Sequence, residues 1–137
     1  MRDERSKGHE PLVLLVEDEL GLRKLMVMIL EDEGYQVIEA ANGAQGLAKL
    51  QEVKPALVIT DYMMPELNGG EMVRAIRRNP AFDDVPILMM SAALPQQIQG
   101  RELVDQFLPK GTGLQALVDT IRRLITGSDK SSADTDS

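Results

Sequence analysis

Residues 57–69 read LVITDYMMPELNG. A short apolar run, typical of a buried strand, ends at Asp61, and a turn rich in Pro, Asn and Gly begins directly after it. A carboxylate at the end of a buried strand contributes nothing to packing, so Asp61 is a candidate for chemistry. Other polar residues should then lie beside it in the fold.

Three other apolar runs also lead to polar residues. These residues are Glu17 and Asp18 after residues 12–16, Ser91 after residues 86–90, and Lys110 shortly after residues 106–108. Carboxylates, a hydroxyl and an ammonium group are what a magnesium-dependent phosphoryl site requires. Four strand-like runs therefore each end near a residue suited to one such site.

Helical patterns separate these runs. We expect strands at residues 12–16, 36–39, 56–60, 86–90 and 106–108. Apolar residues from Leu22 to Leu30 recur at i, i+3, i+4 and i+7, which predicts a first helix that Gly34 ends. Asn42 is expected to start the second helix.

Capping residues predict where the later helices begin. Asn68 and Glu71 have capping-box spacing before the third helix, and Thr112 and Gln115 have it before the last helix. Residues 94–105 lack a helical period and contain a glycine, which favours a short or irregular fourth helix.

Five strand–helix units require a parallel sheet with helices on both faces and right-handed crossovers. We therefore predict an α/β fold, a doubly wound five-stranded parallel sheet. Ligands of such sheets bind at the carboxyl ends of the strands, where the strand order reverses. All the polar residues named above lie at such ends.

Composition narrows the possible partners. The 137 residues suit one domain, and 15 basic against 22 acidic residues give a net charge of −7, which argues against nucleic acid or an anionic membrane as partner. The absence of cysteine excludes disulfides and thiolate catalysis. The polar start lacks the apolar stretch of a signal peptide, so we expect a cytoplasmic protein.

The polar residues, taken together and in this order, make residues 12–124 resemble a response-regulator receiver domain. The elements that carry the resemblance are Glu17-Asp18, Asp61 in DYMMPELNG, Ser91-Ala92, and Lys110 after Phe107. The resemblance implies a flavodoxin-like sheet with strand order 2-1-3-4-5. We expect a polar leader at 1–10, an apparently stand-alone receiver domain at 11–126, and a disordered tail at 127–137.

The resemblance implies three catalytic residues. Asp61 would accept a phosphoryl group from a phosphohistidine, Lys110 would neutralise the phosphoryl oxygens, and Ser91 would donate its hydroxyl to them. Ser91 and Phe107 would form the switch that responds to phosphorylation.

A Mg²⁺ cofactor is implied as well. Its protein ligands would be the carboxylates of Glu17, Asp18 and Asp61 and the backbone carbonyl of Met63.

The sequence departs from the family where Gly111 follows Lys110, because receiver domains usually carry proline there. A cis peptide before a residue other than proline costs about 2.5–4 kcal/mol, so we predict a trans Lys110–Gly111 bond, with the ammonium still reaching Asp61. We further predict that a basic face on the third helix, Arg74, Arg77 and Arg78, is solvated.

The function that follows is that of a single-domain response regulator. It would take its phosphoryl group from a histidine kinase or a histidine phosphotransfer protein and signal to a downstream protein, with no enzymatic activity beyond its own phosphorylation and dephosphorylation. The alternative is a phosphorylation-independent pseudo-receiver that acts as a binding module. An aspartyl phosphatase is disfavoured because Met63 stands where such an enzyme needs a second aspartate.

Overall fold

The computed structural model describes residues 10–92, 96 and 98–127. The predicted leader and tail lie outside these residues, apart from Glu10 and Gly127. In chain order the elements are β1 (Leu12–Val16), α1 (Leu20–Asp32), β2 (Gln36–Ala40), α2 (Gly43–Leu50), β3 (Leu57–Asp61), α3 (Gly69–Arg77), the 3₁₀ helix η2 (Pro80–Phe82), β4 (Ile87–Ser91), the 3₁₀ helix η4 (Arg101–Leu103), β5 (Gln106–Pro109) and α4 (Leu114–Thr126).

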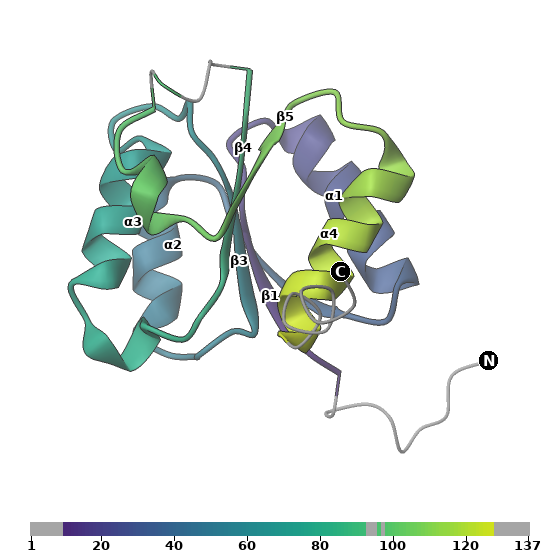
Figure 1. The fold of residues 1–137 in the computed structure, drawn as a ribbon, viewed down its shortest axis with the longest axis horizontal. Helices are drawn as coiled ribbons and strands as arrows, with labels where there is room; N and C mark the ends of the chain where they lie inside the picture. The colour runs from purple at the N-terminus through teal and green to yellow at the C-terminus, as the bar shows by residue number, and fades with distance from the viewer. Residues whose placement is uncertain (1–9, 93–95, 97, 128–137) are drawn as a thin grey trace, which may run out of the picture.

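The five strands form one parallel sheet in the order β2-β1-β3-β4-β5, which confirms the predicted fold class and strand order. Val16 pairs with Ala40 on one side and with Thr60 on the other, and Asp61 pairs with Met90. The labelled strands run upward in Figure 1 and β2 is parallel to β1, so the carboxyl ends of the strands meet at the upper edge of the sheet. The order of strands reverses between β1 and β3, which places the predicted site at that edge.

Helices cover both faces of the sheet. In Figure 1, α2 and α3 lie on one face, and α1 and α4 lie on the other. Alternate residues of β1 supply the two cores: Leu14 and Val16 pack on the α2–α3 side, and Val13 and Leu15 pack on the α1–α4 side. All four are at most 1% exposed, and each such burial contributes about 1.5–3 kcal/mol.

The predicted helix starts are confirmed at two positions and wrong at a third. The Asn42 side chain accepts the N–H of Gln45, and Asn68 forms a complete capping box with Glu71. The predicted Thr112–Gln115 box is absent because α4 begins after Gly113 and the Thr112 hydroxyl donates to the Pro109 carbonyl at 2.6 Å. Thr112 therefore closes the turn after β5.

The connection between β4 and β5 contains no α-helix among its described residues, and η4 is its helical element. The prediction of a short or irregular fourth helix is therefore confirmed, although residues 93–95 and 97 lie outside the described residues. The connection packs backbone to backbone on the first turn of α3, since a Cβ on Gly70 would overlap the carbonyl oxygen of Gln99. The Gln99 N–H also donates to the Tyr62 hydroxyl at 3.4 Å.

Arg77 anchors the far end of this connection, so its predicted solvation is wrong. The side chain is only 16% exposed. Its guanidinium donates to the carbonyls of Leu103, Phe82 and Val85 and pairs with Asp105 at 2.9 Å. The planar guanidinium thus supplies hydrogen bonds to backbone carbonyls in the connections before β4 and before β5. The basic face seen in the sequence does not reveal this role.

Candidate phosphoryl site

Asp61 ends β3 and is 3% exposed. Its Oδ2 atom lies 2.8 Å from Nζ of Lys110, and its Oδ1 atom accepts a long hydrogen bond of 3.4 Å from the Met63 N–H. A buried carboxylate is tolerated only with such partners. One carboxylate oxygen of Asp61 is thus paired with the Lys110 ammonium, and the other accepts only a long hydrogen bond from the turn after β3.

Lys110 reaches Asp61 from the turn after β5. Its backbone N–H donates to the Ser91 carbonyl at 3.0 Å, and Thr112 N–H donates to the Pro109 carbonyl at 3.2 Å. Gly111 has φ of +92°, a value that residues with a Cβ avoid, and no cis peptide occurs among the described residues. Both parts of the prediction for Lys110 and Gly111 are confirmed: the bond is trans and the ammonium reaches Asp61.

Glu17 follows β1 and lies on the other side of Lys110. Its side chain is 7% exposed, with Oε1 at 3.9 Å from the Lys110 Nζ, and Oε2 accepts the Glu19 N–H at 3.1 Å. Burial raises the pKa of the Glu17 carboxyl above its usual value, and the hydrogen bond from Glu19 opposes this shift. Glu17 therefore lies in a place that disfavours its charge.

The pKa of Lys110 is shifted in the direction that keeps the ammonium charged. Burial alone would lower this pKa, but the hydrogen bond to Asp61 and the charges of Asp61 and Glu17 raise it above the usual value. The Lys110 ammonium thus stays protonated at neutral pH.

Three carboxylates of the site can offer oxygens to one metal ion. Glu17, Asp18 and Asp61 each have a carboxylate oxygen such that all three atoms lie within 4.8 Å of one another. Hard oxygen donors of this kind suit Mg²⁺, and the single charge of Lys110 does not balance three carboxylates. The residues present therefore fit a divalent cation.

Ser91 and Phe107 occupy neighbouring strands of the same part of the sheet. Ser91 ends β4 beside β3 and is 1% exposed. Phe107 lies on β5, is partly buried, and packs against the core cluster on the α2–α3 side. The switch roles of these two residues, and the metal-ligand role of the Met63 carbonyl, stay predictions.

Two residues near the site escaped the sequence interpretation. Arg23 of α1 donates from Nη1 to the Glu17 carbonyl at 2.8 Å and from Nε to Glu39 of β2 at 3.0 Å. A charged residue in the second turn of an amphipathic helix indicates only an exposed position. The hydrogen bond from Arg23 of α1 to Glu39 of β2 joins residues 16 positions apart and forms only in the tertiary fold.

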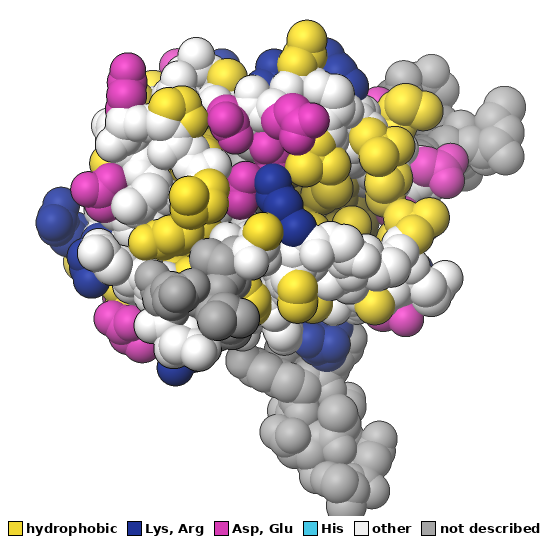
Figure 2. All heavy atoms as spheres, turned by 90° about the horizontal axis from the view of Figure 1, so that it is seen from above, with side chains coloured by type: hydrophobic (Ala, Val, Ile, Leu, Met, Phe, Trp, Pro, Cys, Tyr) yellow, Lys and Arg dark blue, Asp and Glu magenta, His cyan; other side chains and the backbone are white. Residues whose placement is uncertain are grey.

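Two hollows lie at opposite ends of the sheet, and one of them borders the site. An apolar groove of about 280 Å³ borders Lys110, lined by Leu22, Leu25, Met26, Ile29, Met90, Gly111, Thr112, Leu114 and Leu117. Figure 2 shows this end of the molecule, with acidic side chains around a basic one and hydrophobic side chains gathered beside them.

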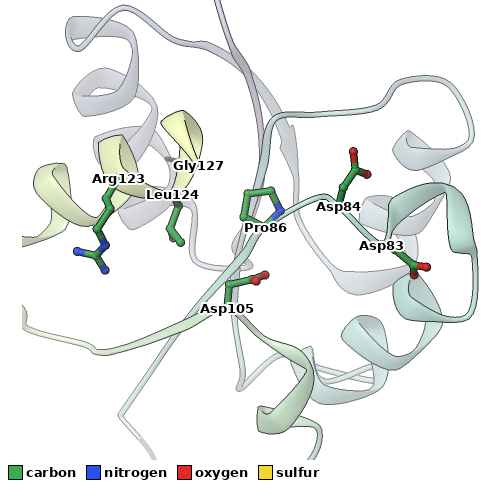
Figure 3. Close-up of a pocket in the computed structure, with 7 residues that line it drawn as sticks. All are labelled: Asp83, Asp84, Pro86, Asp105, Arg123, Leu124 and Gly127. Carbon is green, nitrogen blue, oxygen red and sulfur yellow. The ribbon is translucent and has the colours of Figure 1, made fainter. Parts of the chain in front are cut away.

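The other hollow, of about 300 Å³, lies where β4 and β5 begin (Figure 3), lined by Asp83, Asp84, Pro86, Asp105, Arg123, Leu124 and Gly127. Three of its charged side chains have partners: Lys54 for Asp84, Arg77 for Asp105, and Gln106 for Arg123. It contains none of the predicted site residues.

None of the helices within the described residues has the length and apolar composition needed to cross a membrane.

Comparison with known proteins gives a consistent result. The phosphate regulon transcriptional regulatory protein PhoB of Pseudomonas aeruginosa is 32% identical over 116 residues, which cover 82% of this chain and 51% of PhoB. The hybrid signal transduction histidine kinase D of Dictyostelium discoideum is 31% identical over 121 residues, 86% of this chain but 8% of that protein. The chain thus spans about half of the length of PhoB and a small part of the histidine kinase.

Solved structures match over nearly their full length. The chemotaxis response regulator CheY4 of Vibrio cholerae superposes with a TM-score of 0.78 at 32% identity, covering 84% of this chain and 98% of CheY4. The response regulator protein TrrA of Thermotoga maritima, solved in complex with Mg²⁺-BeF, gives 0.76 at 28% identity, covering 83% and 98%. The response regulator receiver domain family matches residues 13–122, and the chain belongs to this family of two-component signalling modules.

Proposed function

We propose that this protein accepts a phosphoryl group on Asp61 in a Mg²⁺-dependent reaction and signals through protein–protein contacts. The observation that carries the proposal is the pairing of a nearly buried Asp61 carboxylate with Lys110 at 2.8 Å, beside the carboxylates of Glu17 and Asp18. A nucleophile, a fixed cation and a set of metal ligands are the parts that phosphoryl transfer requires.

The donor would be the phosphohistidine of a histidine kinase or a histidine phosphotransfer protein. One oxygen of the Asp61 carboxylate attacks phosphorus, a P–O bond forms, and the P–N bond to the donor imidazole breaks with its electron pair left on nitrogen. Oδ1 is the more available oxygen, since its hydrogen bond from Met63 is long at 3.4 Å while Oδ2 is paired with Lys110.

The chain's own residues then stabilise the transferred charge. Lys110 moves its ammonium from the Asp61 carboxylate to the phosphoryl oxygens, for which its long side chain suffices. Ser91, at the end of the neighbouring strand, donates its hydroxyl to the same group. Mg²⁺, held by Glu17, Asp18, Asp61 and the Met63 carbonyl, would neutralise the carboxylates that otherwise repel the phosphodonor. The Mg²⁺-BeF complex of TrrA supports this part of the proposal.

The apolar groove between α1 and α4 suits the donor protein. Leu25 and Leu114 line it and are 52% and 58% exposed, although both are large apolar side chains. The groove also borders Lys110, so a protein seated on it would bring a phosphohistidine to Asp61. Exposed apolar patches next to a reactive group are typical of protein interaction sites.

Intact-mass measurement with acetyl phosphate tests the proposal. Wild type with Mg²⁺ should gain one phosphoryl group, and Asp61→Asn or excess chelator should prevent it. Asp32→Asn, a change of the same chemistry at an exposed position at the end of α1, should leave the adduct unchanged. Absence of an adduct in wild type would favour the phosphorylation-independent binding module instead.

A further inference from the structure

The loop that carries Glu17 and Asp18 is held by few contacts. The Glu17 N–H donates to the Ala40 carbonyl at 3.0 Å, and the Glu17 carbonyl accepts from Nη1 of Arg23 at 2.8 Å. The two bonds fix the backbone on both sides of Glu17, and only the second comes from a side chain.

Asp18 depends on this backbone more than Glu17 does. The Glu17 carboxylate has its own partner, the Glu19 N–H at 3.1 Å. The Asp18 side chain is exposed, and no hydrogen bond or ion pair to the described residues holds it. The place of its carboxylate is therefore set by the Glu17–Asp18 peptide, whose carbonyl Arg23 holds.

Arg23 is itself well fixed. Its side chain is 15% exposed, and its Nε donates to Glu39 of β2 at 3.0 Å. Lys24 also reaches Glu39, at 3.3 Å, but it is 59% exposed and makes no hydrogen bond or ion pair to Glu17 or Asp18 among the described residues. One guanidinium thus connects α1, the end of β1 and β2, a geometry that its rigid fork of donors allows.

We propose that Arg23 is a positioning residue for the metal site: by holding the Glu17 carbonyl it fixes the backbone from which Asp18 reaches the cation. This rests on the proposed Mg²⁺ site. Removal of an outer partner that orients a metal ligand typically weakens metal binding by about 10–100-fold.

The direction in which Mg²⁺ affinity changes when Arg23 is replaced distinguishes a positioning role from simple charge repulsion. A guanidinium near a cation site repels the cation, so the loss of its charge alone would tighten Mg²⁺ binding. A positioning role predicts the opposite, weaker binding when Arg23 is replaced. Lys24→Ala serves as the matched control because it removes a nearby positive charge that also contacts Glu39.

Calorimetric titration with Mg²⁺, together with the rise in Tm that Mg²⁺ causes, measures binding without any phosphodonor. Arg23→Met, which keeps the apolar stem, should bind Mg²⁺ about 10-fold more weakly than wild type. Lys24→Ala should bind as tightly as wild type or slightly more tightly. Glu39→Gln, which keeps an oxygen for Nε of Arg23, should stay within about threefold of wild type, because Nη1 still reaches Glu17.

Wild-type or tighter binding by Arg23→Met would overturn the inference, as would a wild type that binds no Mg²⁺. Should Arg23→Met fail to fold, Arg23→Lys carries the test. It keeps the charge, but one ammonium cannot reproduce the fork between Glu17 and Glu39, so binding must weaken, and wild-type affinity in this variant overturns the inference. A wild type that binds Mg²⁺ yet forms no Asp61 adduct with acetyl phosphate contradicts the proposed function alone.

Discussion

The backbone N–H of Lys110 donates to the carbonyl oxygen of Ser91 at 3.0 Å. The two residues proposed to contact the phosphoryl group therefore stand on one hydrogen-bonded pair of strand ends. A charge-assisted hydrogen bond from each would contribute roughly 1.5–3 kcal/mol, or about 3–6 kcal/mol together. Turning a population from 1:99 to 99:1 takes about 5.5 kcal/mol, so the switch needs both contacts.

Ser91→Ala should accordingly still accept a phosphoryl group on Asp61 but lose most of the accompanying conformational change. The measurement is amide hydrogen exchange over residues 98–107 with and without beryllofluoride, an acyl-phosphate mimic. Thr120→Val, which removes another buried hydroxyl, from α4, should respond as wild type does. An equal response in wild type and Ser91→Ala would contradict the switch.

Gly111→Ala should destabilise the protein, because φ of +92° forces a Cβ into the left-handed region at a cost of about 1–2 kcal/mol. Nothing crowds the site of the new Cβ, so the cost comes from the backbone. Gly21→Ala, exposed within α1 and equally free of neighbours, should instead stabilise by up to about 1 kcal/mol. Thermal unfolding compares the two, and equal shifts in Tm would count against the assigned turn.

Gly70→Ala should also destabilise, for a different reason. The new Cβ would overlap the Gln99 carbonyl, and overpacking of this kind costs about 1–3 kcal/mol. Because alanine otherwise stabilises a helix, the sign of the change decides whether the connection truly rests on α3. Faster amide exchange at residues 98–103, measured beside Gly21→Ala, should accompany the loss in Tm.

The ion pair of Glu39 predicts a pH dependence of stability. Burial raises the pKa of this carboxyl, but the hydrogen bonds from Arg23 and Lys24 outweigh it and leave the pKa below its usual value. A folded-state pKa lowered in this way adds stability above the unfolded-state pKa of about 4, and the gain disappears as pH falls through the folded-state value.

Glu39→Gln should therefore lower the free energy of unfolding at pH 7 by at most about 1 kcal/mol, since the side chain is 32% exposed. The difference between variant and wild type should shrink from about pH 5 to pH 3. Urea unfolding across this range tests it, and a difference that grows on acidification would be the wrong sign.

Leu25→Ser should slow phosphoryl transfer from a donor protein without affecting the reaction with acetyl phosphate. Loss of one half-exposed apolar contact is expected to cost about 1 kcal/mol, roughly a fivefold lower rate of transfer at limiting donor. An autophosphorylated histidine kinase core that phosphorylates wild type is the probe. Met28→Ser is the control, because Met28 lies on the same helix and is 66% exposed but does not line the groove. Equal slowing by both variants would exclude a specific role for the groove.

The sequence predicted the sheet well because buried parallel strands read as continuous apolar runs, and Asn42, Asn68 and Gly34 mark helix ends through local hydrogen bonds or backbone geometry. Thr112 misled because its hydroxyl can either accept a backbone N–H at a helix start or donate to a nearby carbonyl. In the fold it donates to the Pro109 carbonyl and closes the turn at Gly111.

Arg23 and Arg77 were not predictable for another reason. Each is held by partners far away in sequence, such as Glu39 for Arg23 and Asp105 for Arg77. Periodicity places such residues on the outside of a helix and gives no sign of what the fold brings over them. The gathering of Glu17, Asp18, Asp61 and Lys110 could be predicted because parallel strands bring their carboxyl ends to one edge.

The connection between β4 and β5 bears on signalling fidelity. A cell with several two-component pathways must prevent a phosphorylated regulator from engaging the effectors of the others. The described residues between these strands present the 3₁₀ helix η4, and Arg77 of α3 donates to the carbonyl of its last residue, Leu103. An effector shaped to grip a longer helix at this place would find a different surface, so this connection would insulate the protein from cross-talk as much as it defines a contact of its own.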